Sequence, residues 1–177
     1  MNSKLPADYL QSFIKDLCNE GIKFIIAGGV AGVLNGIERV TMDLDLALEL
    51  SPENVKKFSG LMKRLGLIPL VPVATEELAN PSVVKKMVDE KHAVVFMLAD
   101  PDFPLRKVDV FLTDNLSYVS LFKSSETLNF DGVEFRVVTL EKLLELKRAV
   151  QPPRDKDLWD IQAIEKLLTR RNQGKLE

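Results

Sequence analysis

Two aspartates, Asp43 and Asp45, alternate with leucines in the segment Met42–Leu50, MDLDLALEL. Alternate residues of a β-strand point to the same face, so this spacing predicts two neighbouring carboxylates on one face and apolar side chains on the other. Like charges this close repel each other, and a cation between them removes the repulsion. Mg²⁺ suits this role because it binds one or two carboxylates and completes its shell with water and phosphate oxygens. The alternative is a solvated strand face with ordinary surface acids.

Two further features favour a metal-dependent site over a solvated face. Gly28 and Gly29 stand between an apolar segment and a stretch of helical character, where glycines allow a phosphate group to approach the backbone closely. A third carboxylate, Asp109, lies in the predicted strand KVDVFL, and its valine neighbours point to the other face. Three carboxylates beside such a turn predict phosphoryl or nucleotidyl transfer assisted by two metal ions about 3.5–4 Å apart, with Asp109 as general base.

Arg39 and Thr41 flank the aspartate pair on its N-terminal side. Both side chains can contact phosphate or orient the carboxylates, so both are candidate nucleotide-binding residues. The structural alternatives are a turn residue for Arg39 and a β-branched residue at the start of a strand for Thr41.

The segment Gly28–Asp45 contains, in order, two glycines, an alanine, a glycine, an arginine, a threonine and the two aspartates. This pattern resembles the signature of the DNA polymerase beta-like nucleotidyltransferase superfamily. Within it, the chain is most similar to the AbiEii-like nucleotidyltransferases, the toxins of type IV toxin–antitoxin systems. The resemblance implies a mixed sheet flanked by helices, an NTP substrate and Mg²⁺. It also implies that the diglycine holds the triphosphate and that the three aspartates bind metal.

A second segment, ELKRAVQPPRDKDLWDI, is similar to the same family's lysine followed by Arg-x-Lys-Asp-x-x-Asp. By this resemblance Lys147 lies near the triphosphate, and the remaining positions are matched by Arg154, Lys156, Asp157 and Asp160. Without the resemblance, Lys147 would be a solvated lysine on an amphipathic helix, and Asp157 would be a pairing partner for a nearby basic side chain.

Together these residues predict a Mg²⁺-dependent nucleotidyltransferase that moves a nucleoside monophosphate from an NTP to an acceptor hydroxyl. The toxin resemblance implies RNA, tRNA in particular, or a protein as acceptor and a cognate antitoxin as partner. Aminoglycoside and lincosamide nucleotidyltransferases have a very similar glycine and aspartate block, so a small-molecule acceptor is the enzymatic alternative. A nucleotide-binding partner without turnover is the non-catalytic alternative.

Helical and strand patterns intermix along the chain, which predicts an α/β or α+β fold with a mixed sheet and a helical C-terminal end. We expect one nucleotidyltransferase domain over residues 1–177, with a core of about residues 1–138 and C-terminal helices over 139–171. The predicted strands are Lys23–Ala27, Met42–Leu50, a hairpin of Ala93–Leu98 with Lys107–Leu112, a second hairpin around Asp131–Gly132, and an edge or irregular segment Leu67–Val73. The predicted helices are Ala7–Glu20, one that Ser51-Pro52-Glu53 opens, Glu76–Glu90 with a break at Pro81, Leu116–Lys123, Leu140–Val150 and Asp155–Arg171.

The chain has 24 basic and 26 acidic side chains among its 177 residues, a formal net charge of −2. This balance argues against a protein that coats nucleic acid, which needs a strongly basic face. The single cysteine, Cys18, cannot form an internal disulfide, no apolar run approaches the roughly 20 residues of a membrane helix, and the first residues lack the order of a secretory signal. We therefore expect a cytoplasmic protein without a membrane partner.

Overall fold

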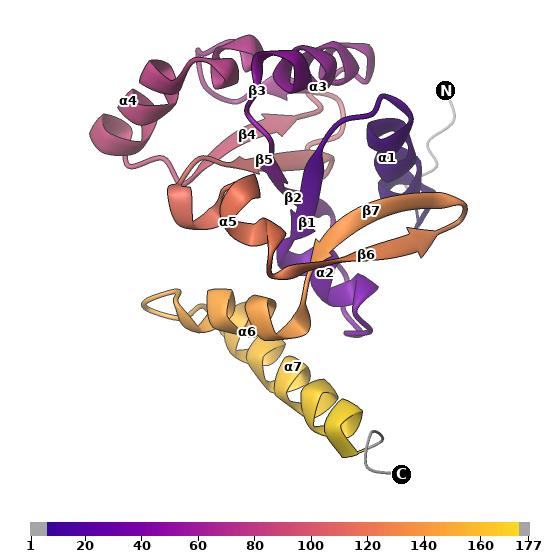
Figure 1. Cartoon of the computed structure of the whole chain (residues 1–177). Coiled ribbons are helices and arrows are strands. Elements are labelled where there is room, and N and C mark those ends of the chain that lie inside the picture. Colours follow the sequence, from indigo (N-terminus) through magenta and orange to yellow (C-terminus); the bar gives the residue numbers. More distant parts are fainter. Residues whose placement is uncertain (1–6, 174–177) are drawn as a thin grey trace.

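The computed structural model describes residues 7–173. In this part of the chain seven strands form one mixed sheet, in the order β3-β4-β5-β2-β1-β7-β6, and helices cover both of its faces (Figure 1). This is the predicted α/β architecture. The strands are β1 (Phe24–Ala27), β2 (Asp43–Leu48), β3 (Ile68–Pro69), β4 (Val95–Ala99), β5 (Lys107–Phe111), β6 (Ser125–Phe130) and β7 (Val133–Val138).

Both predicted hairpins are present as antiparallel pairs, β4 with β5 and β6 with β7. Asp131 and Gly132 connect the second hairpin, and both have positive φ angles, of 50° and 83°. A type I′ turn requires positive φ at both of its central residues, and its twist matches the twist of the two hairpin strands. β3 has only two residues and lies at the sheet edge, where the missing N–H of Pro69 is tolerated.

The centre of the sheet sets the positions of the three aspartates. β2 runs antiparallel to β1 and parallel to β5. The register of β2 on β5 places Asp45 opposite Asp109 and Asp43 opposite Lys107. Because partners in register on neighbouring strands point to the same face, Asp45 and Asp109 are direct neighbours.

The helices are α1 (Ala7–Asn19), α2 (Gly28–Leu34), α3 (Pro52–Arg64), α4 (Pro81–Lys91), α5 (Tyr118–Phe122), α6 (Leu140–Arg148) and α7 (Asp155–Gln173), with short 3₁₀ turns η1 (Thr75–Ala79) and η2 (Asp114–Leu116). The predicted break at Pro81 is present, and one further predicted helix is divided. The segment 76–90 is η1 followed by α4, because Asn80 accepts a hydrogen bond from the Ser82 N–H and so caps the start of α4. The segment 116–123 is divided at Ser117, whose hydroxyl caps α5.

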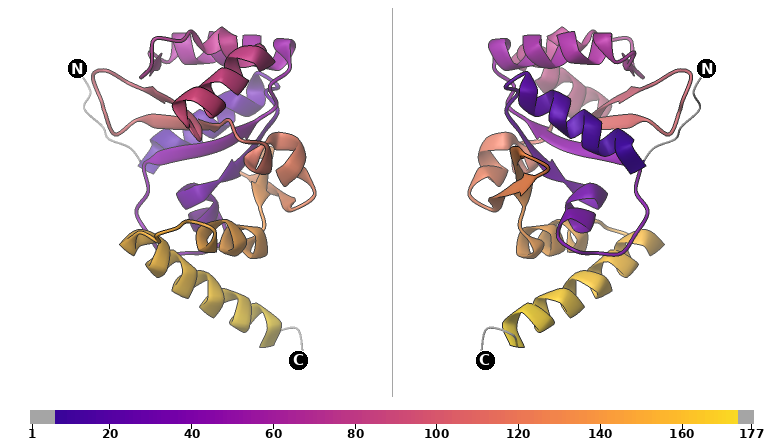
Figure 2. Two further views of the ribbon diagram at one scale, coloured as in Figure 1. Left: turned by 90° about the vertical axis from the view of Figure 1, so that its left-hand side faces the viewer. Right: turned by 90° about the vertical axis from the view of Figure 1, so that its right-hand side faces the viewer.

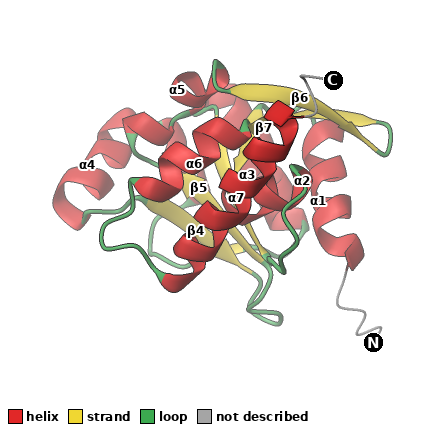
Figure 3. Ribbon diagram, turned by 90° about the horizontal axis from the view of Figure 1, so that it is seen from below, coloured by secondary structure: helices red, strands yellow, loops and turns green. Residues whose placement is uncertain are grey.

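The helices form two layers around the sheet. α1, α3 and α4 lie on one face, and α2, α6 and α7 lie on the other (Figures 1 and 2). Seen from below, α6 and α7 cross in front of the central strands (Figure 3). Apolar side chains such as Ile25, Leu46 and Val110 are fully buried and form the core between the layers. Among residues 7–173, none of the helices combines the length and the apolar character that crossing a bilayer requires.

Candidate active site

A pocket of about 450 Å³ lies between the central strands and the C-terminal helices. Every residue that the sequence singled out as catalytic, metal-binding or nucleotide-binding lines it, and the motif residues Arg154, Lys156 and Asp157 line it as well. The eight predicted site residues are Gly28, Gly29, Arg39, Thr41, Asp43, Asp45, Asp109 and Lys147. The fold therefore brings together residues that are more than one hundred positions apart in the chain.

Burial and neighbouring charges raise the pKa of two of the three carboxylates, Asp45 and Asp109. Burial raises the pKa of Asp45, and the charge of Asp43 adds to the rise, while hydrogen bonding to the Gly29 backbone and the charge of Lys147 oppose it. The pKa of Asp109 is raised to about 6, first by burial and then by the charges of Asp45 and Asp43. Asp109 Oδ1 is buried, and no group among residues 7–173 hydrogen-bonds to it. A carboxylate with a raised pKa and a buried oxygen that lacks a hydrogen-bond partner is typical of functional sites.

The diglycine bend leaves no room for a side chain. Gly28 has a φ of +58°, and a Cβ atom there would lie 1.8 Å from Asp45 Oδ2. A Cβ atom on Gly29 would lie 2.5 Å from Thr41 Oγ1. α2 begins at these glycines and not after them. The bend therefore contributes close backbone approach to Asp45 and Thr41, which only glycine allows.

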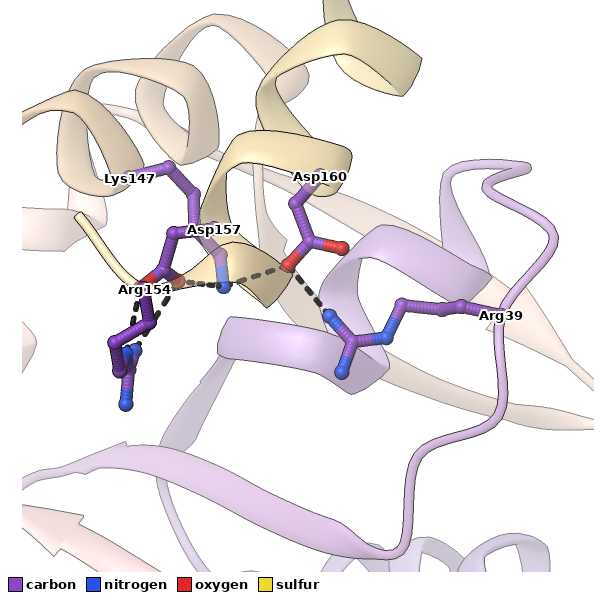
Figure 4. A network of polar contacts seen from close by, with 5 residues as sticks. All are labelled: Arg39, Lys147, Arg154, Asp157 and Asp160. Atoms are coloured by element: carbon purple, nitrogen blue, oxygen red, sulfur yellow. Dashed lines mark hydrogen bonds and ion pairs between the residues drawn. The ribbon is translucent and has the colours of Figure 1, made fainter.

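Basic and acidic side chains from three parts of the chain form an ion-pair network beside the pocket (Figure 4). Lys147 Nζ lies 2.9 Å from Asp157 Oδ1 and 2.7 Å from Asp160 Oδ2. Arg39 also pairs with Asp160, and Arg154 Nε lies 2.6 Å from Asp157 Oδ2. The network ties the loop before β2 to α6 and α7.

Asp157 is the buried centre of this network, with 0% of its side chain exposed. Burial alone would raise its pKa, but hydrogen bonds from Arg154 and Lys147, together with their charges, hold the pKa of Asp157 well below its usual range. The side chain of Lys147 is only 11% exposed, and its charge also acts on Asp45. Lys147 therefore lies between two acidic groups, the catalytic candidates on one side and its α7 partners on the other.

Two parts of the site were missed by sequence reasoning. The link from Arg39 to Asp160 joins residues 121 positions apart, and no local spacing predicts it. The apolar wall of the pocket also carries no motif, although Phe111 lies two residues after Asp109 and so shares its strand face. This wall is formed by Val94, Val95, Phe111, Leu116, Leu143, Leu146, Ala149 and Val150.

Solved structures with a similar fold include nucleotidyltransferases. The lincosamide antibiotic adenylyltransferase LnuA, with lincomycin bound, aligns with a TM-score of 0.62 and 13% identity over 93% of this chain and 99% of that one. The chain has the nucleotidyltransferase fold. ANT(2'')-Ia in complex with adenylyl-2''-tobramycin gives a TM-score of 0.55 and 14% identity, with 93% of each chain covered. An antigenic nucleotidyltransferase-like protein from Paracoccidioides brasiliensis gives 0.53 and 20%, over 92% of this chain and 78% of that one.

No protein-family model and no curated protein matches the chain in sequence. The nucleotidyltransferase fold agrees with the superfamily that the glycine and aspartate pattern resembles. The closer resemblance to the AbiEii-like toxins stays a prediction.

The pocket of this nucleotidyltransferase fold contains oxygen donors of the type that Mg²⁺ prefers. The candidate donors are carboxylate oxygens, one of them buried and without a partner among the described residues, and they line the pocket together with the diglycine bend. Over residues 7–173, no group of three or more His, Cys, Asp or Glu side chains is arranged so that it could hold a metal ion as it stands. Mg²⁺ often uses only one or two carboxylates with water and phosphate, so the donor set fits an ion that arrives with the nucleotide.

Replacing Asp109 by asparagine is expected to stabilise the metal-free protein above pH 6. A carboxylate whose pKa is about 6 in the folded state and near 4 when unfolded binds its proton more tightly in the folded protein, so the wild type loses stability as pH rises through that window. We expect Asp109→Asn to be about 1–2 kcal/mol more stable at pH 8, after allowance for solvent screening, and no different at pH 3.5. Urea unfolding in EDTA measures this, and an equal difference at both pH values would contradict it.

Gly28→Ala is expected to remove NTP binding, because its Cβ would displace the Asp45 carboxylate. The matched control is Gly66→Ala, where φ is +73° but no atom lies within 4 Å of the added Cβ. Both variants should lose about 1–2 kcal/mol of folding free energy, because alanine is strained in the left-handed backbone conformation. Only Gly28→Ala should also lose affinity for NTP. Thermal unfolding and calorimetric titration with NTP and Mg²⁺ separate the two effects, and unchanged NTP affinity in Gly28→Ala would argue against the bend as the triphosphate site.

Proposed function

We propose that this protein is a Mg²⁺-dependent nucleotidyltransferase, which transfers a nucleoside monophosphate from an NTP to an acceptor hydroxyl and releases pyrophosphate. The observation that carries the proposal is the presence of three aspartates, the diglycine bend and four basic side chains in one pocket. The nucleotidyltransferase fold supports it. The basic side chains are Arg39, Lys147, Arg154 and Lys156.

Asp43, Asp45 and Asp109 are the residues that would hold one or two Mg²⁺ ions. Bound Mg²⁺ supplies charge neutralisation at the triphosphate and at the oxygens between which the nucleotidyl group moves. Gly28 and Gly29 let the triphosphate approach the backbone, and Arg39 and Thr41 border the same space. Lys147 and Arg154 add positive charge on the side of α6 and α7, where they would stabilise the leaving pyrophosphate.

In the proposed reaction the acceptor oxygen attacks the α-phosphorus of the NTP. A new oxygen–phosphorus bond forms, the bond from the α-phosphorus to the oxygen that bridges to the β-phosphate breaks, and pyrophosphate leaves. Asp109 accepts the proton of the acceptor hydroxyl. Its unpartnered Oδ1 and its pKa of about 6 suit a general base that is ionised at neutral pH yet more basic than an ordinary aspartate.

Two acceptor classes follow from different observations. The C-terminal motif, whose members cluster around Lys147, supports an AbiEii-like enzyme that modifies RNA, tRNA in particular, or a protein and is neutralised by an antitoxin. A small molecule is supported by the neighbours that were solved with lincomycin and with adenylyl-tobramycin. The net charge of −2 favours the small molecule, because a nucleic-acid acceptor needs a basic surface.

The function is tested by incubation of the protein with α-labelled NTPs, Mg²⁺ and a panel of acceptors that contains bulk tRNA, lincomycin, tobramycin and cell-extract protein. We expect label on one acceptor class, stoichiometric pyrophosphate release, and loss of both in EDTA. NTP binding in calorimetry without pyrophosphate release under any condition would identify a non-catalytic nucleotide-binding protein and refute the enzyme.

A further inference from the structure

The register of the sheet places three apolar side chains on the face that carries the aspartates. Met97 of β4 is paired with Asp109 of β5, and partners in register point to the same face. The register of β3, with Ile68 opposite Ala99, continues through the hydrogen bond from the Leu70 N–H to the Met97 carbonyl. Ile68, Leu70 and Met97 therefore share one sheet face with Asp109, and we call these three side chains the β3–β4 face.

The β3–β4 face is open to solvent. Ile68 and Leu70 are each 51% exposed and Met97 is 38% exposed, whereas Phe96 and Leu98, which point to the opposite face of β4, are at most 1% exposed. The helix layer on the aspartate side begins with α2, which packs against β1, β2 and β7. β3 and β4 lie at the other edge of the sheet (Figure 1). An exposed apolar surface beside a polar pocket is typical of a binding site.

The β3–β4 face continues a row of residues that begins at the diglycine bend. Across the sheet this row contains Ala27, which precedes the bend, then Asp45, Asp109 and Met97. Neighbouring strands are about 4.8 Å apart, so Met97 lies one strand beyond Asp109. In an in-line displacement the attacking and leaving oxygens lie on opposite sides of the phosphorus. With the triphosphate at the diglycine bend, the acceptor therefore approaches from the Asp109 side, over the β3–β4 face.

The shape of the β3–β4 face indicates a large acceptor. Its three side chains line neither the carboxylate pocket nor the two other cavities, of about 460 and 640 Å³, that residues 7–173 form. Small molecules are usually bound in concave sites that enclose most of their surface. An open apolar surface is better matched by a partner that brings a complementary surface of its own.

The chemistry of the β3–β4 face favours a protein over a nucleic acid. Its side chains are uncharged and not aromatic, so they provide neither cations for phosphates nor rings for stacked bases. Lys107 lies on the same sheet face, but it is in register with Asp43 and so belongs to the surroundings of the carboxylates. The net charge of −2 also disfavours a nucleic acid and does not disfavour a protein.

We propose that the acceptor is a protein, which docks on the β3–β4 face through apolar side chains that flank its reacting hydroxyl. The inference rests on the proposed function and narrows its acceptor class. The oxygen of a serine, threonine or tyrosine forms the new bond to the α-phosphorus, pyrophosphate leaves, and Asp109 accepts the hydroxyl proton. Met97 packs against the side chain next to the hydroxyl, and Leu70 and Ile68 pack against the following ones. These three residues determine specificity and take no part in the chemical step.

The binding test uses the full chain without NTP or metal. The probes are two fluorescein-labelled peptides, KGLVYVLGK and KGNQYQNGK, which have the same charge and differ only in the four residues that flank the tyrosine. In fluorescence polarisation we expect the first to bind about tenfold more tightly, because only its flanking side chains bury apolar surface on the face. Leu70→Gln with Met97→Gln should remove this ratio. The matched control, Val119→Gln with Phe130→Gln, changes two exposed apolar side chains outside the carboxylate pocket and should keep it.

The transfer test adds α-labelled NTP and Mg²⁺ to the same peptides. We expect label on the apolar peptide, with a kcat/KM about tenfold above that of the polar peptide. In Leu70→Gln with Met97→Gln, the KM for the apolar peptide should rise about tenfold while the KM for NTP stays within about twofold, because the face contacts only the acceptor. Versions of both peptides with serine in place of tyrosine are run in parallel, and label on either hydroxyl supports the proposal.

Four results would overturn the inference. They are no binding of the apolar peptide, equal affinity for both peptides, an affinity ratio that Leu70→Gln with Met97→Gln leaves unchanged, and label that goes to bulk tRNA, to lincomycin or tobramycin, or to the enzyme chain alone. Failure of the proposed function is a different result. In that case the apolar peptide binds with the stated preference, in wild type and in Asp43→Asn with Asp45→Asn, but no acceptor receives label.

Discussion

Replacing Asp43 and Asp45 together by asparagine is expected to reduce nucleotidyl transfer at least about 1,000-fold. The two amides keep the size of the carboxylates but lose the charges that would hold Mg²⁺ and the triphosphate. The loss should appear in turnover, because the two charges act on the reacting phosphate and not on the acceptor.

The same substitution separates a chemical effect from unfolding. Burial and the charge of Asp43 raise the pKa of Asp45, so the ionised Asp45 carboxylate opposes folding when no cation is present. The double variant should therefore be at least as stable as the wild type in EDTA. Its control is Asp102→Asn with Glu90→Gln, which removes the same charge from two exposed positions outside the pocket and should leave transfer unchanged. Transfer that survives in the Asp43 and Asp45 variant would refute the assignment of these residues.

Asp157→Ala is expected to cost about 3 kcal/mol of folding free energy. The side chain of Lys147 is only 11% exposed, and the change leaves it with one carboxylate partner, Asp160, where it had two. The change also opens a cavity at the fully buried position of Asp157. Nucleotidyl transfer should fall as well, because Asp157 and Asp160 hold the Lys147 ammonium beside the pocket.

The pH dependence of this effect has a definite sign. Because the pKa of Asp157 is lowered in the folded protein, its stabilisation is present above pH 4 and is lost as the pH falls further. The stabilities of wild type and Asp157→Ala should therefore converge in acid. Arg154→Ala is the control, since the Arg154 side chain is 57% exposed and its removal should cost less than about 1 kcal/mol. Urea unfolding measures both variants, and a loss in Asp157→Ala no larger than in Arg154→Ala would contradict the buried network.

The central part of the fold could be predicted because its signals are local. The strict alternation in β2 indicates which way Asp43 and Asp45 point, and the valines around Asp109 do the same for β5. That these strands are neighbours in parallel register is a tertiary property, which no local pattern contains. We expected the two strands to be neighbours only because three carboxylates must lie close together to bind the same metal ions. The break at Pro81 could be predicted because proline stops a helix, whereas the division at Ser117 was missed because its capping bond competes with continued helix where apolar periodicity is uninterrupted.

The surroundings of the site were less predictable for a physical reason. Arg39 and Asp160 lie in a loop and a helix far apart in sequence, and their ion pair depends on how α7 packs over the sheet. The motif indicated that Asp157 and Asp160 matter, but not that both share Lys147.

The central claim is that Asp43, Asp45 and Asp109 act together on a triphosphate that lies at the Gly28–Gly29 bend. A crystal structure of the protein with a non-hydrolysable NTP analogue and Mg²⁺ tests it most directly. We predict a metal ion in contact with carboxylate oxygens of these aspartates and phosphate oxygens beside the two glycines. An analogue bound away from the bend, or Asp109 turned out of reach of the metal, would contradict the account.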